Sequence, residues 1–270
     1  MKDYPYFYCM KYLNLLLLVF SCLLSSIIFA QTPKQIEDDL LKSFKKIDHW
    51  RRSDINSSAP SNYDVDSLGE ENDKFSKTLI DYTSKFPSTI TQQFKSFYDS
   101  GLGIVSSADK RLRIYFWDTG MGGTQVDYSN VIQYKKGQKT NSNEVVWKEN
   151  TRKTPAYDTI YTLKRNKRTY YLAIYTAKMS SQEYIHGVQV FSIENDTLND
   201  NVKLIKTSAG LHSMLEFSYV EDYQGNDGAE ILYDEKSAIL KIPVVLENGK
   251  ANGNYITYKF TGQYFERVKN

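Results

Sequence analysis

The period of the hydrophobic pattern changes near Gly101, and this change constrains the fold more than any other feature of the chain. Before it, apolar residues recur at intervals of three and four, which indicates amphipathic helices; after it, they alternate with polar residues, which indicates half-buried strands. Short strands separated by Gly, Asn and Asp turns are typical of sandwiches and propellers. We therefore expect a mainly β fold with an N-terminal helical segment, built as a partial β-propeller-like or β-sandwich sheet array.

Two amphipathic helices are predicted before this change, at 33–50 and 67–85. Thr32 can cap the first of them, and Pro33 suits its first turn because proline is tolerated there. The polar, breaker-rich segment 53–66 should form the loop that joins the two helices.

A shorter helical piece is expected to follow. Pro87 should end the second helix, because proline interrupts the helical hydrogen bonds. In the segment 88–98 the apolar residues Ile90, Phe94 and Phe97 would then share one side of a short helix.

The segment after Gly101 is predicted to contain a series of short strands. We expect them at 111–118, 124–135, 143–148, 169–178, 184–193, 202–207, 214–221, 229–234, 237–246, 254–260 and 263–268. Three stretches that begin at Arg111, Thr169 and Ser237 share a strand–turn–strand layout, with starts about sixty residues apart. They indicate an internal repeat, with chance similarity of β-hairpins as the alternative.

The first thirty residues read as a secretory signal peptide. Lys2 and Lys11 precede a mostly apolar run at 13–30, which ends in the small residue Ala30. Translation could start at Met1 or at Met10. We expect an exported protein, periplasmic or extracellular, with a signal peptide at 1–30, an N-terminal helical cap at 31–100 and a β-rich domain at 101–270.

Two other interpretations of this segment stay open. It could remain as a membrane anchor, although its continuous apolar part is shorter than the roughly 20 residues that a spanning helix needs. Cys22 could carry a lipid, although the residues before it match such a site poorly. If cleavage occurs, no membrane span is expected in the mature chain.

Removal of residues 1–30 would remove both cysteines, Cys9 and Cys22. The mature chain would then have neither disulfides nor thiolate metal ligands, and its stability would rest on its core, with or without a metal. The formal net charge is only +2, and no block of like charge appears. Nucleic acid is therefore not an expected partner, because phosphate binding needs a basic face.

The most specific local motif is a candidate calcium loop. Asp222, Gln224, Asn226 and Glu230 place oxygen-bearing side chains at the first, third, fifth and ninth positions of a turn, and calcium prefers six to eight oxygen ligands. The segment resembles the calcium loops of FG-GAP-type β-propeller repeats over about eleven residues. It departs from them in its neutral Gln224 and Asn226, and in Asp227, which replaces a glycine. A plain hairpin turn is the alternative.

A glycine-rich turn at 117–124 is a second candidate site. Trp117, Asp118, Thr119 and Met121 could form a lip that binds a small ligand or a partner. The segment lacks the lysine and the following helix of a phosphate loop. The alternative is a long hairpin turn in which Asp118 and Thr119 bond the backbone.

Familiar catalytic patterns are absent from the sequence. The three histidines are far apart, which does not favour a zinc site, and no nucleophile motif surrounds any serine. A hydrolase with paired carboxylates stays open because acidic residues are plentiful. The carboxylates considered are Asp118, Asp127, Glu183, Glu216, Asp222 and Asp234.

As a whole, the chain resembles secreted β-rich proteins of unknown function from Bacteroidetes. The resemblance rests on the Phe29-Ala30-Gln31 end of the export signal, the two helices, and the Trp117-Asp118-Thr119 turn followed by tyrosine-rich strands. It implies export and no particular activity. We expect an exported, non-enzymatic binding module of the cell envelope with a protein or glycan partner. The alternatives are an envelope hydrolase with paired carboxylates and a structural assembly protein that docks through its helices.

Overall fold

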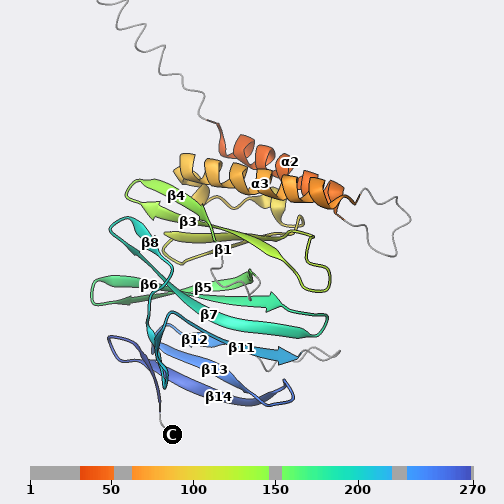
Figure 1. Cartoon of the computed structure of the whole chain (residues 1–270). Helices are drawn as coiled ribbons and strands as arrows, with labels where there is room; N and C mark the ends of the chain where they lie inside the picture. The colour runs from red at the N-terminus through yellow and green to blue at the C-terminus, as the bar shows by residue number, and fades with distance from the viewer. Residues whose placement is uncertain (1–30, 52–62, 146–153, 221–229, 269–270) are drawn as a thin grey trace, which may run out of the picture. The chain divides into compact units, whose positions relative to one another are not determined.

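The computed structural model describes residues 31–51, 63–145, 154–220 and 230–268. The prediction of a mainly β fold with helices near the N-terminus is confirmed (Figure 1). The helical elements are α2 (Pro33–Trp50), α3 (Val65–Lys85), η1 (Pro87–Ile90) and η2 (Lys95–Phe97). The first strands are β1 (Leu102–Ser106), β2 (Leu112–Asp118), β3 (Tyr128–Lys136), β4 (Lys139–Glu144), β5 (Ala156–Arg165), β6 (Arg168–Lys178), β7 (Glu183–Glu194) and β8 (Thr197–Asn199). The remaining strands are β9 (Ile205–Thr207), β10 (Gly210–His212), β11 (Met214–Val220), β12 (Leu232–Asp234), β13 (Ile239–Val245), β14 (Ala251–Phe260) and β15 (Phe265–Arg267).

Both predicted helices form, and their caps explain where they begin. At α2, Oγ1 of Thr32 accepts a hydrogen bond from Gln35 N at 3.2 Å, and Oε1 of Gln35 accepts one from Thr32 N at 2.8 Å. This reciprocal pair is a capping box. Helix α3 starts two residues earlier than predicted, because Asp64 caps it by accepting from Ser67 N at 2.7 Å.

The predicted helical piece at 88–98 is wrong: two separate 3-10 turns, η1 and η2, occupy this segment. The buried Arg113 of β2 explains the interruption, since its guanidinium donates to the carbonyls of Thr89 and Gln92, each at 2.7 Å. Phe94 adopts a left-handed conformation with φ 51° and buries its ring. Tertiary contacts thus override the local apolar spacing.

The described strands form three sheets. The first has the order β1-β2-β3-β4 and the second β11-β7-β6-β5, with β8 beside β7. The third has the order β10-β9-β15-β14-β13-β12. Its β15–β9 pair is parallel, whereas all the other pairs are antiparallel. None of these orders closes on itself, so the arrangement is sandwich-like rather than a closed barrel or propeller among the described residues.

The three stretches noted as a sequence repeat lie at equivalent places in the three sheets. The stretch from Arg111 supplies β2 and β3, the stretch from Thr169 supplies β6 and β7, and the stretch from Ser237 supplies β13 and β14. In each sheet these strands are the second and third of a four-strand antiparallel meander. The layout similarity therefore has a structural counterpart, one meander per sheet.

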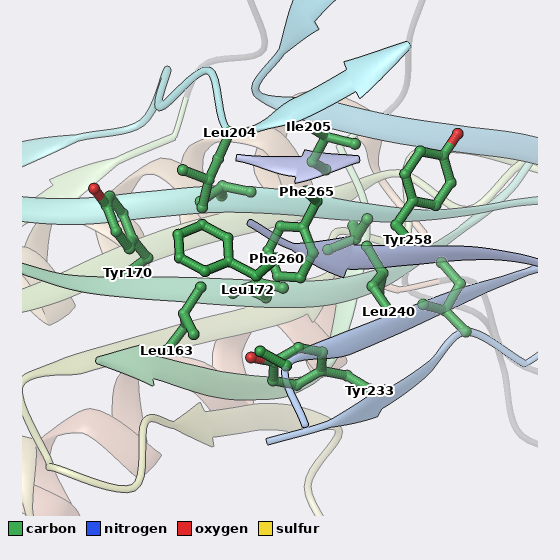
Figure 2. Packing of buried hydrophobic residues seen from close by; sticks show 14 of the residues in the cluster. Leu163, Tyr170, Leu172, Leu204, Ile205, Tyr233, Leu240, Tyr258, Phe260 and Phe265 are labelled. Atoms are coloured by element: carbon green, nitrogen blue, oxygen red, sulfur yellow. The ribbon is translucent and has the colours of Figure 1, made fainter. Parts of the chain in front are cut away.

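Two apolar clusters join the sheets face to face. Ile114 and Ile132 of the first sheet pack with Tyr171 and Phe191 of the second. Leu172 and other residues of the opposite face of the second sheet pack with the third sheet in a second cluster. Figure 2 shows this second cluster, in which Phe260 and Phe265 lie near Leu172 and Leu204.

A bulge in a strand that is buried on both faces explains why strand β5 is missing from the predicted set. Its buried residues Tyr157, Ile160 and Leu163 are three apart rather than two apart. Ile160 belongs to the cluster with the first sheet and Leu163 to the cluster with the third, and the pairing register shifts between Tyr157 and Thr159. A bulged strand that is buried on both faces has no simple alternation. The short strands β1, β8 and β10 are likewise absent from the prediction.

Candidate functional site

The predicted calcium loop falls almost entirely outside the described residues. Asp222, Gln224 and Asn226 lie outside the described residues, whereas Glu230 is an exposed residue just before β12. Within the described ranges, no group of three or more His, Cys, Asp or Glu side chains is placed to hold a metal ion. Calcium binding by the loop stays a prediction.

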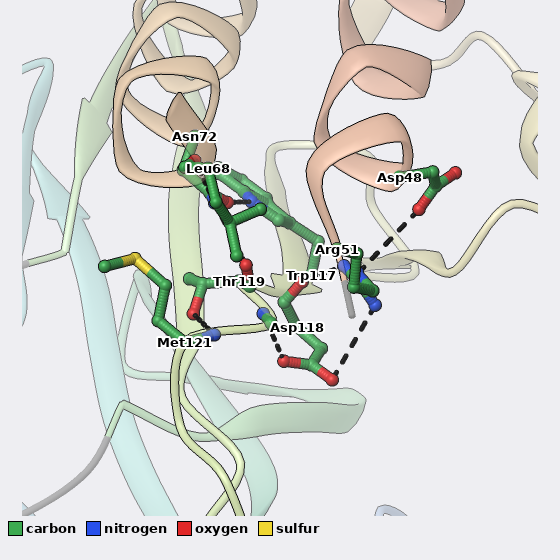
Figure 3. Close-up of polar contacts among 9 residues, drawn as sticks. Asp48, Arg51, Leu68, Asn72, Trp117, Asp118, Thr119 and Met121 are labelled. Atoms are coloured by element: carbon green, nitrogen blue, oxygen red, sulfur yellow. Dashed lines mark hydrogen bonds and ion pairs between the residues drawn. The ribbon is translucent and has the colours of Figure 1, made fainter. Parts of the chain in front are cut away.

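Trp117, predicted to form part of a binding lip, is instead a core residue. Its side chain is 0% exposed. Its Nε1 donates to Oδ1 of Asn72 on α3 at 2.8 Å, and its ring packs edge-on against Phe75, with centroids 4.9 Å apart. Figure 3 shows the indole directed toward Asn72 and away from the turn. The tryptophan therefore fixes α3 on the first sheet and is not presented to a ligand.

Hydrogen bonds to the backbone hold the turn that follows. Oδ1 of Asp118 accepts from Gly120 N at 2.8 Å, and Oγ1 of Thr119 accepts from Met121 N at 3.2 Å. Thr119 N donates to the carbonyl of Asp127 at 2.8 Å, which closes the turn onto β3. Asp and Thr favour turns through bonds of this kind, so these two side chains shape the turn.

Arg51, at the end of α2, also contacts this turn. Its Nη2 donates to the carbonyl of Asp118, and its Nη1 lies 3.8 Å from Oδ2 of the same residue (Figure 3). Gly120 has φ +75°, and a Cβ there would lie 3.2 Å from Cγ of Arg51, so a glycine suits this position. Met121 is 45% exposed. Met121 and the partly exposed carboxylate of Asp118 are therefore the groups of this turn that are accessible to a binding partner. Trp117 is not among them.

The structure brings four ring-bearing side chains together on the second sheet. Tyr184 and His186 lie on β7, opposite Tyr219 and Phe217 of β11. The rings of Tyr184 and Tyr219 are nearly parallel, at 23° with centroids 5.5 Å apart. His186 lies 5.3 Å from the ring of Tyr219 and 6.0 Å from that of Phe217. All four are half-buried, and we call them the aromatic row.

The aromatic row continues the core between the second and third sheets. The next cross-strand pair along β7 and β11 is Val188 with Leu215. Both residues, together with Phe217, pack in the cluster that joins these two sheets. Because alternate residues of a strand share a face, the line of side chains passes from this core into the half-exposed rings.

A carboxylate and a hydroxyl lie beside the row. Oδ2 of Asp158, at the bulge of β5, accepts from Oγ1 of Thr176 at 2.9 Å and lies 3.7 Å from Nε2 of His186. Burial raises the pKa of Asp158, and the Thr176 hydroxyl and the His186 ring oppose this rise. Nζ of Lys178 lies 5.5 Å from the ring centre of Tyr184. The row therefore combines apolar ring faces with hydrogen-bonding groups.

A surface hollow of about 350 Å³ borders the row at Tyr219. Its other side is the β13–β14 turn, which includes Leu246, Glu247 and Asn248. Val220 N donates to the carbonyl of Gly249 at 2.8 Å and joins the two sides. A ligand that lies on the row would thus find further polar groups next to it.

Several carboxylates considered for a hydrolase are engaged in the fold. Oε2 of Glu216 accepts from the hydroxyl of Tyr175 at 2.9 Å. Asp234 accepts from Lys236 N at 2.9 Å and from Ser237 Oγ at 2.6 Å in the β12–β13 turn. These bonds give both residues a structural role.

The aromatic row was missed in the sequence, although part of its signal was present. Tyr184 and His186 are two apart within one predicted strand, and Phe217 and Tyr219 are two apart within another. Such spacing places each pair on one face of its strand. What the sequence did not reveal is that β11 returns to pair with β7 after three intervening short strands.

Comparisons with protein-family models, with curated proteins and with solved structures found no match. Within the ranges that the structure describes, no helix is long and apolar enough to cross a bilayer.

Proposed function

We propose that the chain is an exported, non-enzymatic binding module of the cell envelope that holds a glycan on the aromatic row. The observation that carries this proposal is the stacked pair of half-buried tyrosines, Tyr184 and Tyr219, beside the Asp158 carboxylate. Export is supported by the signal-like segment 1–30.

The chemistry of a sugar matches this mixed surface. The C–H face of a pyranose ring is apolar and can lie against an aromatic ring, while its hydroxyls need hydrogen-bond partners. The row supplies ring faces, and Asp158, Thr176 and His186 supply acceptors and donors next to them. Ligand sites commonly combine aromatic walls with a few polar groups in this way.

Affinity electrophoresis tests the proposal. The purified chain would be run through native gels that contain a soluble β-glucan, a xylan or a mannan, and we expect one of these polysaccharides to retard it. Tyr184→Ala and Tyr219→Ala should each abolish the retardation, because each removes one of the stacked rings. Tyr98→Ala is the matched control, since Tyr98 is 69% exposed and lies outside the row.

Two results would count against glycan binding by the row. One is migration unaffected by every polysaccharide, and the other is retardation that persists in both tyrosine variants. A protein partner that is lost in the same two variants would keep the row as the binding site but would change the class of ligand, because tyrosine is equally suited to protein contacts.

Docking through the helices, the assembly alternative, needs a different test from helix deletion. Phe75 of α3 packs against both Phe44 of α2 and Trp117 of the first sheet. Removal of α3 would therefore expose the face of that sheet and destabilise the fold. Substitutions at exposed helix residues such as Lys45 and Lys77 are the appropriate test of a docking face.

A further inference from the structure

Several hairpin turns of the three sheets meet at one end of the strands. Strands β1, β3, β5 and β7 all run toward this end, and side chains of one sheet bond the turns of the next. The β3–β4 and β5–β6 turns lie on the same side in Figure 1. The connecting bonds are Gly137 N to Asp196 Oδ1 at 3.0 Å, Tyr171 Oη to Asp109 Oδ2 at 3.1 Å, Thr162 N to Glu235 Oε1 at 3.2 Å and Asn166 Nδ2 to Gly262 O at 3.1 Å.

The β5–β6 hairpin carries the densest positive charge at this end. Lys164, Arg165, Lys167 and Arg168 are four cations within five residues, and all four are exposed. The expectation that the sequence contains no block of like charge is therefore wrong at this point. Asn166 and Lys167 have φ 50° and 63°, the conformation of a tight two-residue hairpin turn, which keeps the four cations close together.

Two of the neighbouring turns, 107–111 and 135–139, add to this charge, whereas 194–197 and 234–238 are net negative. In the turns 107–111, 135–139, 164–168, 194–197 and 234–238, ten lysines and arginines stand against five aspartates and glutamates. We call this set of turns the basic face. Its net charge of +5 exceeds the +2 of the whole chain, so the remaining residues carry a net charge of −3. The near-neutral total conceals a strong charge asymmetry.

Two surface hollows flank the β5–β6 hairpin, and each is lined by cations of the hairpin together with a cation of a neighbouring turn. One, of about 340 Å³, is lined by Arg111, Lys167 and Arg168 together with Glu194. The other, of about 460 Å³, is lined by residues that include Lys164, Arg165 and Lys236, with Asp109 and Glu235. Cations from the first, second and third sheets thus share one surface.

We propose that the basic face docks the protein on an anionic membrane surface. Each lysine or arginine near such a surface contributes to attraction through the negative surface potential, and the contributions of a cluster add. The cations are spread over turns of three sheets rather than gathered in one deep pocket, which suits a plane of mobile phosphate headgroups. This function is separate from that of the aromatic row, which is built from the opposite ends of β7 and β11.

Nucleic acid fits the basic face less well. Single-stranded nucleic acids are usually held by aromatic side chains as well as by cations. Among the described residues, none of the large exposed hydrophobic side chains lies in these five turns. Five carboxylates are also interspersed among the cations, which disfavours a close fit to one chain of phosphates.

Vesicle cosedimentation tests the proposal with the full chain. We expect binding to vesicles of phosphatidylcholine mixed with phosphatidylglycerol to exceed binding to pure phosphatidylcholine, and the excess to vanish at high salt because salt screens surface charges. The readout is the difference in binding between the two kinds of vesicle, since an apolar segment such as 13–30 would bind to both kinds. Replacement of all four hairpin cations by glutamine should weaken the excess binding by about a hundredfold or more.

A charge-matched control separates the basic face from the net charge. Glutamine at Lys42, Lys45, Lys77 and Lys95 removes four exposed cations from the helical segment, and this variant should bind the anionic vesicles like the unmodified chain. Equal loss in the two variants, or no preference for anionic vesicles at low salt, would overturn the proposal. Circular dichroism of both variants checks that the fold is retained.

Discussion

The indole Nε1 of Trp117 donates a 2.8 Å hydrogen bond to Oδ1 of Asn72, and this bond joins the first β-sheet to helix α3 inside the core. The same asparagine donates through Nδ2 to the carbonyls of Leu68 and Thr119, at 2.9 and 3.0 Å. The oxygen and the nitrogen of this one side-chain amide thus connect a helix, a strand and the turn after the strand. This arrangement explains why a tryptophan next to a glycine-rich turn lies in the core.

Loss of the Asn72 side-chain amide should lower the stability of the fold. Asn72→Ala removes all three hydrogen bonds and leaves the indole N–H buried without its acceptor, so we expect the free energy of unfolding to fall by about 3 kcal/mol. Urea denaturation measures the change. The neighbouring exposed residue provides the control, and Asp73→Ala should unfold at nearly the same urea concentration as the unmodified chain. Similar midpoints for both variants would show that the Asn72 bonds contribute little.

Arg113 is expected to stabilise the segment that connects α3 to the sheets. It is 6% exposed and donates to Ser106 Oγ at 2.8 Å as well as to the carbonyls of Thr89 and Gln92. Arg113→Met keeps an apolar stem but removes these charge-assisted bonds, and should lower the free energy of unfolding by about 3 kcal/mol. Hydrogen exchange of the amides in 87–98 should rise in parallel. Unchanged exchange there would contradict the role assigned to the guanidinium.

Two glycines make room for aromatic rings on their partner strands. A Cβ at Gly187 would overlap the ring of Tyr175, and one at Gly103 would overlap the ring of Phe116. Gly187→Val should therefore displace Tyr175 from its bond to Glu216 and cost about 2 kcal/mol through overpacking. Gly69→Ala is the control, because its added carbon would lie 3.7 Å from Met121, an ordinary contact, and a helix favours alanine. Thermal melts that rank the two variants in the opposite order would refute this explanation.

The raised pKa of Asp158 gives a stability effect of predictable sign. Between the ordinary carboxyl pKa of 3.8 and the raised value, the folded state binds more protons than the unfolded state, so stability falls as pH rises through that range. Asp158→Asn should remove this fall and leave the chain at least as stable at neutral pH. If the aromatic row binds a glycan, the same variant should bind it more weakly. A fall in stability with pH that is identical in both chains would contradict the assignment.

Sequence patterns predicted the fold class well because burial on one face leaves a regular period. Helices α2 and α3 were located on this basis, whereas β6 and β7, which are buried on both faces, were located as apolar runs bounded by turns. The pattern fails where a strand that is buried on both faces also contains a bulge, as in β5, or where a side chain from elsewhere intervenes, as Arg113 does at 88–98. In both cases the deciding contact is far away in the sequence, and local spacing carries no record of it.

The candidate site was harder to predict than the fold. Trp117 was predicted to be accessible to a ligand because its neighbours are turn residues. The alternation of side chains along β2 instead directs its indole toward α3. The aromatic row and the basic face both arise when strands or turns that are distant in the sequence come together. Only the run of cations at 164–168 could have been read directly, as a short local block.

Buried tyrosines should make the protein sensitive to alkali. Tyr115 is fully buried, its hydroxyl donates to Oε1 of Gln133 at 2.9 Å, and burial raises its pKa from 10.0 to about 12, an effect that Arg113 partly opposes. The folded state therefore keeps the proton between these two pH values while the unfolded state loses it, and stability falls as pH rises through the range. Urea midpoints across this range should decline more steeply for the unmodified chain than for Tyr115→Phe, which has no proton to lose at this position. The absorbance of tyrosinate, followed with circular dichroism, should show part of the ionisation coinciding with unfolding. Complete ionisation before any loss of structure would mean that Tyr115 is reached by solvent in the folded state, contrary to its position between the first sheet and the helices.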